Sequence, residues 1–122
     1  MRVHEARSDA LPAAMTVFDS AMLQTDAGAV EAAIDGADLL VATSEGRVLG
    51  ACLLDGHEIE AIAVRPGRRG QGIGTALVAA AADRRGRLVA EFDPRVRPFW
   101  DALGFEIEVV ADGRLRGVRS VE

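Results

Sequence analysis

A glycine- and arginine-rich segment, Val64-Arg-Pro-Gly-Arg-Arg-Gly-Gln-Gly-Ile-Gly-Thr75, most constrains what this chain can fold into. It follows an apolar run and precedes an alanine-rich helical pattern, so it predicts a turn from a strand into a helix. Gly70, Gly72 and Gly74 allow the backbone to approach an anion closely. The free N–H groups at the start of a helix favour negative charge. The segment therefore predicts a site for a polyphosphate.

Size and charge bound the class of protein. A chain of 122 residues, 49% of them hydrophobic, fits one domain over residues 1–122. Its formal net charge is -5, and only the region of Arg65 to Arg69 is strongly basic, so we expect no nucleic-acid partner. The apolar runs are shorter than the roughly 18 residues that cross a bilayer, so we expect no membrane partner.

The cysteine content predicts a reducing, cytoplasmic setting. Cys52 is the only cysteine, and its apolar neighbours in a predicted strand favour a small buried side chain over a nucleophile. No cysteine or histidine pattern has the spacing of metal ligands, so we expect no metal site.

The first third of the chain predicts a strand and two helices. Residues 2–6 read as a short strand, and Ser8 or Asp9 is expected to cap the first helix. Thr25 or Asp26 is expected to cap the second, which ends near Gly36. The predicted core face of the first helix carries Leu11, Met15, Phe18 and Met22, and that of the second carries Val30 and Ile34.

The rest of the chain predicts a mixed sheet. Three apolar runs, at residues 39–43, 48–54 and 58–64, are separated by tight turns and predict an antiparallel meander. A helix over 73–85 then leads to a strand over 88–92, which the right-handed crossover makes parallel to 58–64. A short helix over 95–103 precedes a hairpin of 105–110 with 115–121. The predicted fold class is α/β (α+β): a mostly antiparallel sheet with one central parallel pair and helices on both faces.

Three segments of the chain form a recognisable set. Arg69-Gly-Gln-Gly-Ile-Gly74 has the pattern R/Q-x-x-G-x-G/A, Glu60-Ala-Ile-Ala-Val-Arg-Pro66 is the strand before it, and Phe99-Trp-Asp-Ala-Leu-Gly-Phe105 follows it. Together they resemble the signature, the preceding strand and the "FY…GF" segment of the GNAT superfamily of acyl-CoA-dependent N-acetyltransferases. The resemblance extends over residues 38–110. It implies a single GNAT-like domain that binds acetyl-CoA and an amine acceptor. The acetyl group would pass to the amine, and coenzyme A would remain as the product.

The resemblance also implies roles for individual residues. Ile62, Ala63 and Val64 would offer backbone groups to the pantetheine arm and polarise the acetyl carbonyl, while Phe99 and Trp100 would pack beside the thioester. Asp93 either hydrogen-bonds the pantetheine or caps the next helix. The backbone N–H groups expected to hold the pyrophosphate belong to Arg69, Gly70, Gln71, Gly72, Ile73, Gly74 and Thr75.

Two glutamates are the candidate general bases. Glu58 and Glu60 are two residues apart on one strand, so we expect both to face the same side as Ile62 and Val64. A carboxylate can take the proton of the attacking amine directly or through water. Glu58, Glu60 and water all remain open as the base, and the two carboxylates could instead line a solvated edge.

The general acid of many relatives is absent. Trp100 stands where those relatives have the tyrosine of "FY", and the chain contains no tyrosine. An indole N–H has no useful acidity, so we expect an enzyme that is slow or that relies on positioning more than on acid catalysis. The alternative is a non-catalytic acyl-CoA-binding sensor or interaction module. The acceptor is not readable from the sequence, and a homodimer is left open.

Two other nucleotide-binding patterns fit poorly. In Gly70-Gln-Gly-Ile-Gly-Thr75 a threonine occupies the position of the third glycine of the dinucleotide fingerprint G-x-G-x-x-G. The preceding run also ends a meander instead of opening a strand-helix-strand unit. No Gly-Lys-Ser or Gly-Lys-Thr follows, which excludes a P-loop.

Overall fold

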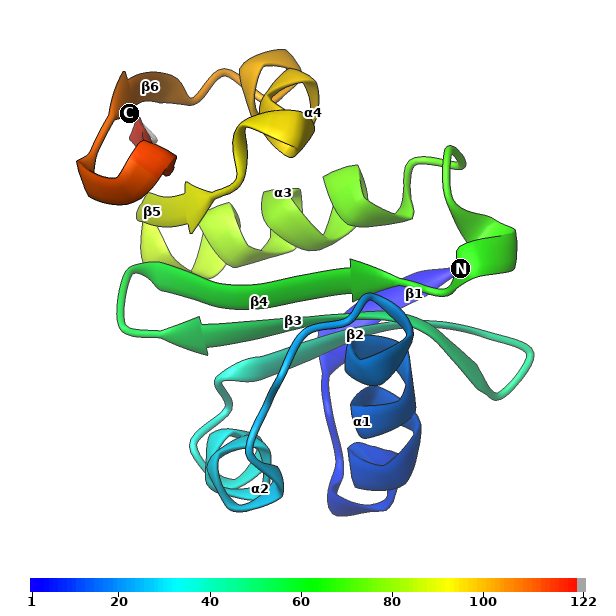
Figure 1. The fold of residues 1–122 in the computed structure, drawn as a ribbon. Helices are drawn as coiled ribbons and strands as arrows, with labels where there is room; N and C mark the ends of the chain where they lie inside the picture. The colour runs from blue at the N-terminus through cyan, green and yellow to red at the C-terminus, as the bar shows by residue number, and fades with distance from the viewer. Residues whose placement is uncertain (121–122) are drawn as a thin grey trace.

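Seven strands form one sheet in the order β1-β2-β3-β4-β5-β7-β6 (Figure 1). The computed structural model describes residues 1–120. Neighbouring strands are antiparallel except β4 and β5, the parallel pair at the centre, so the predicted mixed sheet is confirmed. The strands are β1 (Arg2–Glu5), β2 (Leu39–Ser44), β3 (Arg47–Asp55), β4 (Glu58–Val64), β5 (Arg87–Phe92), β6 (Glu106–Val109) and β7 (Leu115–Ser120).

Helices cover both faces of this sheet, as predicted. They are α1 (Leu11–Ser20), α2 (Ala27–Asp35), α3 (Ile73–Arg85) and α4 (Arg97–Ala102). Helix α3 lies on one face, and α1 and α2 lie on the other (Figure 1). On the α3 face, Leu77 is fully buried in a cluster with Leu88 of β5. On the α1 face, Phe18 and Val30 are buried in a second cluster with Val41 of β2. The sheet is therefore the middle layer between two apolar cores.

Helix α1 begins and ends differently from the prediction. Ser8 and Asp9 lie in a 3₁₀ turn, and the N-cap residue of α1 is Ala10, with no side-chain cap. Pro12 occupies the first turn, where the missing N–H of proline leaves no helical hydrogen bond unmade. The helix ends before Met22, which has a φ of 61° and is 90% exposed. The predicted cap and the predicted core position of Met22 are wrong, because helical spacing does not mark where a helix stops.

Helix α2 has one of its two predicted caps. The Asp26 carboxylate accepts a hydrogen bond from the Ala29 N–H at 3.0 Å. Thr25, the alternative, instead donates its hydroxyl to the Met15 sulfur at 3.7 Å. Gly36 follows the last residue of α2, as predicted.

The C-terminal third adds the hairpin that completes the sheet. A 3₁₀ turn, Pro94–Val96, precedes α4, so the predicted helix over 95–103 is shorter and begins later. Strand β7 inserts between β5 and β6, which leaves β6 at the edge. Val121, the predicted last residue of the final strand, lies outside the described residues. Within residues 1–120, no helix is both long and apolar enough to span a bilayer.

Candidate active site

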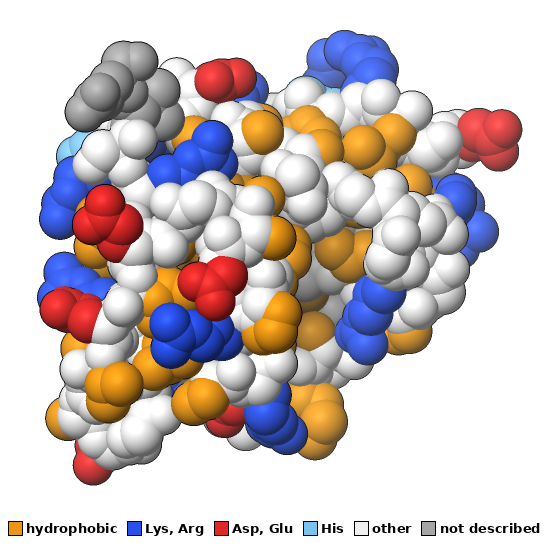
Figure 2. Space-filling view, turned by 90° about the horizontal axis from the view of Figure 1, so that it is seen from above, with side chains coloured by type: hydrophobic (Ala, Val, Ile, Leu, Met, Phe, Trp, Pro, Cys, Tyr) orange, Lys and Arg blue, Asp and Glu red, His pale blue; other side chains and the backbone are white. Residues whose placement is uncertain are grey.

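Strands β4 and β5 separate soon after they begin. Their parallel register consists of two pairs, Glu58 with Val89 and Ile59 with Ala90. Beyond Ile59 an open cleft of about 840 Å³ lies between the two strands, bounded by the start of α3, the end of β5 and the loop after α1. In the view from above, Arg, Asp and Glu side chains surround exposed hydrophobic groups (Figure 2). The carboxyl ends of diverging parallel strands are a common ligand site, as the sequence predicted here.

The glycine-rich turn forms one end of this cleft. Gly70 and Gly72 have φ values of 77° and 82°, and a Cβ at either would meet no atom within 4 Å. Glycine is therefore required by backbone conformation and not by crowding. Gly72 is the N-cap residue of α3 and offers no side-chain cap. Within residues 1–120, the N–H groups of Ile73, Gly74 and Thr75 have no hydrogen-bond acceptor. They remain free to bind an anion.

Arginines of the same turn add positive charge. Arg68 and Arg69 are exposed and line the cleft. Arg69 donates its Nε–H to the Val64 carbonyl at 3.2 Å, and Arg68 donates to Gln71 Oε1 at 3.3 Å. These contacts hold both guanidinium groups near the free N–H groups without neutralising their charge.

An aromatic cluster forms the wall of the cleft beside the start of α3. Trp100 is 4% exposed and stacks on Phe92, with ring centroids 5.1 Å apart and an interplanar angle of 16°. It meets Phe99 and Phe105 edge-on at 5.1 and 4.9 Å. A Cβ on Gly74 would lie 3.1 Å from the Phe99 ring, so glycine lets α3 approach this cluster. Trp100 is thus mainly a core residue that shows a small part of its ring to the cleft.

Most of the sequence-predicted residues come together here. Glu58 and Gln71 are exposed but do not line the cleft. The predicted residues that line it are Glu60, Ile62, Ala63, Val64, Arg69, Gly70, Gly72, Ile73, Gly74, Thr75, Asp93, Phe99 and Trp100.

A β-bulge corrects the predicted orientation of the two glutamates. Leu53 of β3 pairs with Ala61 while the next residue, Leu54, pairs with Ile59, which leaves Glu60 as an extra residue in β4. As a result Ile59 and Ile62, three residues apart, both pack into the α3-side core. Glu58 therefore faces away from Ile62, and the expectation of one shared face with Ile62 and Val64 is wrong. Bulges are frequent next to active sites because they redirect a side chain.

Glu60 carries a perturbed carboxyl group. Desolvation raises the pKa of Glu60 above its ordinary value of 4.5, and the negative charges of Asp55 and Glu58 raise it further. A hydrogen bond between the carboxyl groups of Glu60 and Asp55 acts in the same direction. This elevation brings the pKa of Glu60 closer to the range of a working general base at neutral pH.

Asp93 caps the turn after β5. Its Oδ1 accepts hydrogen bonds from the backbone N–H of Arg95 at 2.9 Å and from the Arg95 Nε–H at 3.1 Å. These bonds, the backbone one first, lower the pKa of Asp93. Of the two predicted roles, the cap is observed.

Several residues at the site were not identified from the sequence, and three of them are charged groups beside or within the cleft. Asp55 is the hydrogen-bonding partner of Glu60. Glu91 and Arg114 line the cleft from β5 and from the turn before β7. Asp55 precedes one tight turn and Arg114 follows another. From the sequence alone, both residues resemble ordinary solvated turn residues. Ile59 and Ile62, two large apolar residues three apart in a strand, were the signal of the bulge.

Solved structures share this fold at low sequence identity. A GNAT-family acetyltransferase from Bacillus cereus is 13% identical with a TM-score of 0.84, covering 99% of this chain and 97% of its own. A Mycobacterium tuberculosis protein in complex with coenzyme A is 20% identical with a TM-score of 0.82 and full coverage of both chains. N-acetylglutamate synthase from Neisseria gonorrhoeae, complexed with coenzyme A and N-acetyl-glutamate, is 17% identical with a TM-score of 0.81, covering 99% of this chain and 35% of its own.

A family model gives the same assignment from the sequence. No curated protein matches the chain. The model described as an acetyltransferase (GNAT) domain matches residues 35–107, close to the limits expected from the motifs. The matched segment runs from the end of α2 into β6 and contains the glycine-rich turn, both diverging strands and the aromatic cluster. Because it spans more than half of the chain, this protein belongs to the GNAT family of acetyltransferases.

Proposed function

We propose that this protein transfers an acetyl group from acetyl-CoA to a primary amine of a small molecule or peptide. The observation that carries the proposal is one cleft that joins an anion-binding turn, an unpaired strand edge and a carboxyl group of raised pKa. Family membership and the coenzyme A complexes of two structural neighbours support it.

The coenzyme would lie along β4. The pyrophosphate would accept hydrogen bonds from the N–H groups of the glycine-rich turn, close to Arg68 and Arg69. Beyond Ile59, the edge of β4 that faces β5 has no strand partner among residues 1–120. The backbone groups that this edge presents at residues 62–64 are therefore available to the pantetheine amides, apart from the Val64 carbonyl, which accepts the Arg69 Nε–H. One of these N–H groups would also stabilise the oxyanion that forms on the acetyl carbonyl.

The acetyl transfer itself needs a neutral amine. Glu60, Glu58 or a water held by them would take a proton from the ammonium form of the acceptor, and the free amine would attack the thioester carbon. A carbon–nitrogen bond forms, the carbon–sulfur bond breaks, and coenzyme A leaves as a thiolate. We place Glu60 first among these candidates because it lines the cleft, whereas Glu58 does not.

The leaving thiolate would be protonated without a dedicated acid. The chain has no tyrosine, and the Trp100 indole is packed in the aromatic cluster. A thiol with a pKa of about 8.5 is a tolerable leaving group near neutral pH. The rate would then depend on how well the cleft aligns the amine with the thioester.

A thiol-reagent assay tests the proposal. Purified protein, acetyl-CoA and each member of a panel of amines and N-terminal peptides are mixed, and free coenzyme A is measured. Cys52 contributes little background, because burial raises the pKa of its thiol to about 12. The proposal predicts coenzyme A release that depends on an amine and is matched by the acetylated product in mass spectrometry.

The alternative is an acyl-CoA-binding sensor or interaction module of the same fold. The burial of Trp100 at the position of the usual acid favours this candidate. Calorimetric binding of acetyl-CoA without release across the whole panel would support the sensor and contradict the transferase.

A further inference from the structure

The two sides of the cleft are chemically different. Phe99 and the start of α3, the expected coenzyme side, pack on the α3 face of the sheet. On β5, Ala90 and Phe92 are buried in that same cluster, so Glu91 between them points to the opposite face. The loop after α1, which also lines the cleft, comes from that opposite side. A second ligand can therefore reach the gap from the α1 side without crossing the coenzyme.

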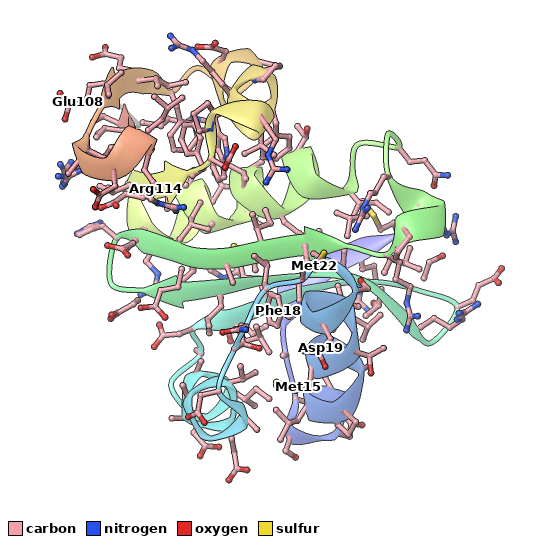
Figure 3. The ribbon with its side chains drawn as sticks, viewed as in Figure 1. Met15, Phe18, Asp19, Met22, Glu108 and Arg114 are labelled. Atoms are coloured by element: carbon pink, nitrogen blue, oxygen red, sulfur yellow. The ribbon has the colours of Figure 1, made fainter. Side chains whose placement is uncertain are left out.

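Arg114 belongs to this second side. Leu115 packs into the α3-side core and Arg114 is extended, so the side chain of Arg114 points to the other face, like that of Glu91. Strand β7 pairs Leu115 with Phe92, which places Arg114 beside Asp93 at the end of β5. The charge of Arg114 accordingly contributes to the lowered pKa of Asp93. Figure 3 shows Arg114 on the turn between β6 and β7, above β4, with Met15, Phe18 and Asp19 on α1 below that strand.

The backbone around Arg114 is fixed. Its carbonyl accepts a hydrogen bond from the Val110 N–H at 2.9 Å. Asp112 and Gly113 both have positive φ, 62° and 73°, which makes a tight turn before it. The buried Leu115 anchors the next residue. The backbone of Arg114 is thus held at the cleft wall, and its exposed side chain extends from that fixed position.

The charge of Arg114 acts on Asp93, but no direct ion pair neutralises it among residues 1–120. Among residues 1–120, Arg114 forms no ion pair within 4.0 Å, whereas Arg95 nearby is held by Asp93 at 3.1 Å. Glu60 and Glu91 line the same cleft and supply carboxylates, and the charges of Asp55 and Glu58 act on Glu60 from outside it. A ligand with a positive amine and a negative carboxylate matches both charges, while a polyamine matches only the carboxylates.

We propose that Arg114 binds a carboxylate of the acceptor, so that the acceptor is an amino acid or another amine that carries a carboxylate. This inference rests on the proposed transferase function. The amine lies toward Glu60 and the thioester, and the carboxylate forms charge-assisted hydrogen bonds with the planar guanidinium fork of Arg114.

The test compares acceptors with and without the carboxylate. Amino acids, their amides and the corresponding decarboxylated amines are assayed with the wild type, Arg114→Gln, Arg114→Lys and the control Arg47→Gln, which changes an exposed arginine that does not line the cleft. The wild type should prefer amino acids to their amides. Arg114→Gln should lower kcat/KM for amino acids at least about tenfold through KM, with Lys intermediate, and should leave the amides and the KM of acetyl-CoA unchanged. Arg47→Gln should match the wild type.

Equal kcat/KM values of the wild type for amino acids and their amides would overturn the role of Arg114. An equal loss of kcat/KM for both kinds of acceptor in Arg114→Gln would overturn it as well. Turnover of no amine at all would instead contradict the transferase. In that case calorimetric titration of the coenzyme A complex with N-acetyl amino acids decides the matter. Binding that is lost in Arg114→Gln supports the carboxylate site, and no binding to the wild type overturns it.

Discussion

At the scale of single residues, Gly72 is the residue on which the proposed coenzyme binding depends most. Its positive φ allows the turn to present the free N–H groups of α3. We expect Gly72→Val to weaken acetyl-CoA binding by well over tenfold, because valine strains this conformation and shields the N–H groups. The control is Gly67→Val, since Gly67 also has open space around it but a φ outside the left-handed region. A wild-type affinity of Gly72→Val for acetyl-CoA in calorimetry would refute the anion-binding role of the glycine-rich turn.

Glu60 is the residue on which the proposed proton transfer depends most. A general base acts when it is ionised, so the rate should fall as the pH drops through the raised pKa of Glu60. Glu60→Gln should lower kcat about 100-fold, remove this acidic limb and leave coenzyme binding intact. Glu58→Gln is the matched control, because it removes a neighbouring carboxylate that does not line the cleft. An unchanged kcat in both variants would leave water or the acceptor as the base.

The same carboxyl group has a consequence for stability. The folded protein holds the proton of Glu60 more tightly than the unfolded chain does, since the folded pKa is raised. This group therefore contributes stability that is complete below pH 4.5 and is lost as the pH rises through the folded pKa. Denaturant titrations at acidic and neutral pH should show this loss in the wild type and not in Glu60→Gln.

At the scale of elements, α4 is held by its aromatic packing. Trp100 fills the space between Phe92, Phe99 and Phe105, and truncation would leave a cavity there. Trp100→Ala should lower the free energy of unfolding by about 3–5 kcal/mol. Val109→Ala on the edge strand β6, where Val109 is 73% exposed, should change it by less than about 0.5 kcal/mol. A small effect of Trp100→Ala in urea denaturation would mean that the cluster does not support the cleft wall.

The helices and strands also show which parts of the fold could be predicted from the sequence. Tight turns and the crossover rule predicted the meander and the parallel pair, because these depend on local backbone chemistry. The glycine-rich turn was predictable for the same reason. The bulge at Glu60 was missed because a strand was assumed to alternate without interruption, although Ile59 and Ile62 carried the evidence against this. The end of α1 before Met22 was missed because apolar spacing continues past it.

At the scale of the whole molecule, the cleft exists because elements distant in sequence meet. Residues 20–23, the β4 strand, the end of β5 and Arg114 line it together. Motifs predicted the expected coenzyme side, since the residues proposed to contact the pyrophosphate and the pantetheine come from one continuous segment. The acceptor side depends on tertiary placement of the loop after α1 and the turn before β7, and neither contains a motif. Hence the sequence indicated the donor substrate better than the acceptor.

The most direct test of the central claim is a crystal structure of the protein with acetyl-CoA. We expect the pyrophosphate to accept hydrogen bonds from N–H groups between Arg69 and Thr75, and the pantetheine to lie along β4 with the thioester near Ile62. We also expect the acetyl group to face Glu60 through the gap between β4 and β5. Density for the coenzyme on another surface, with this cleft empty, would contradict the account.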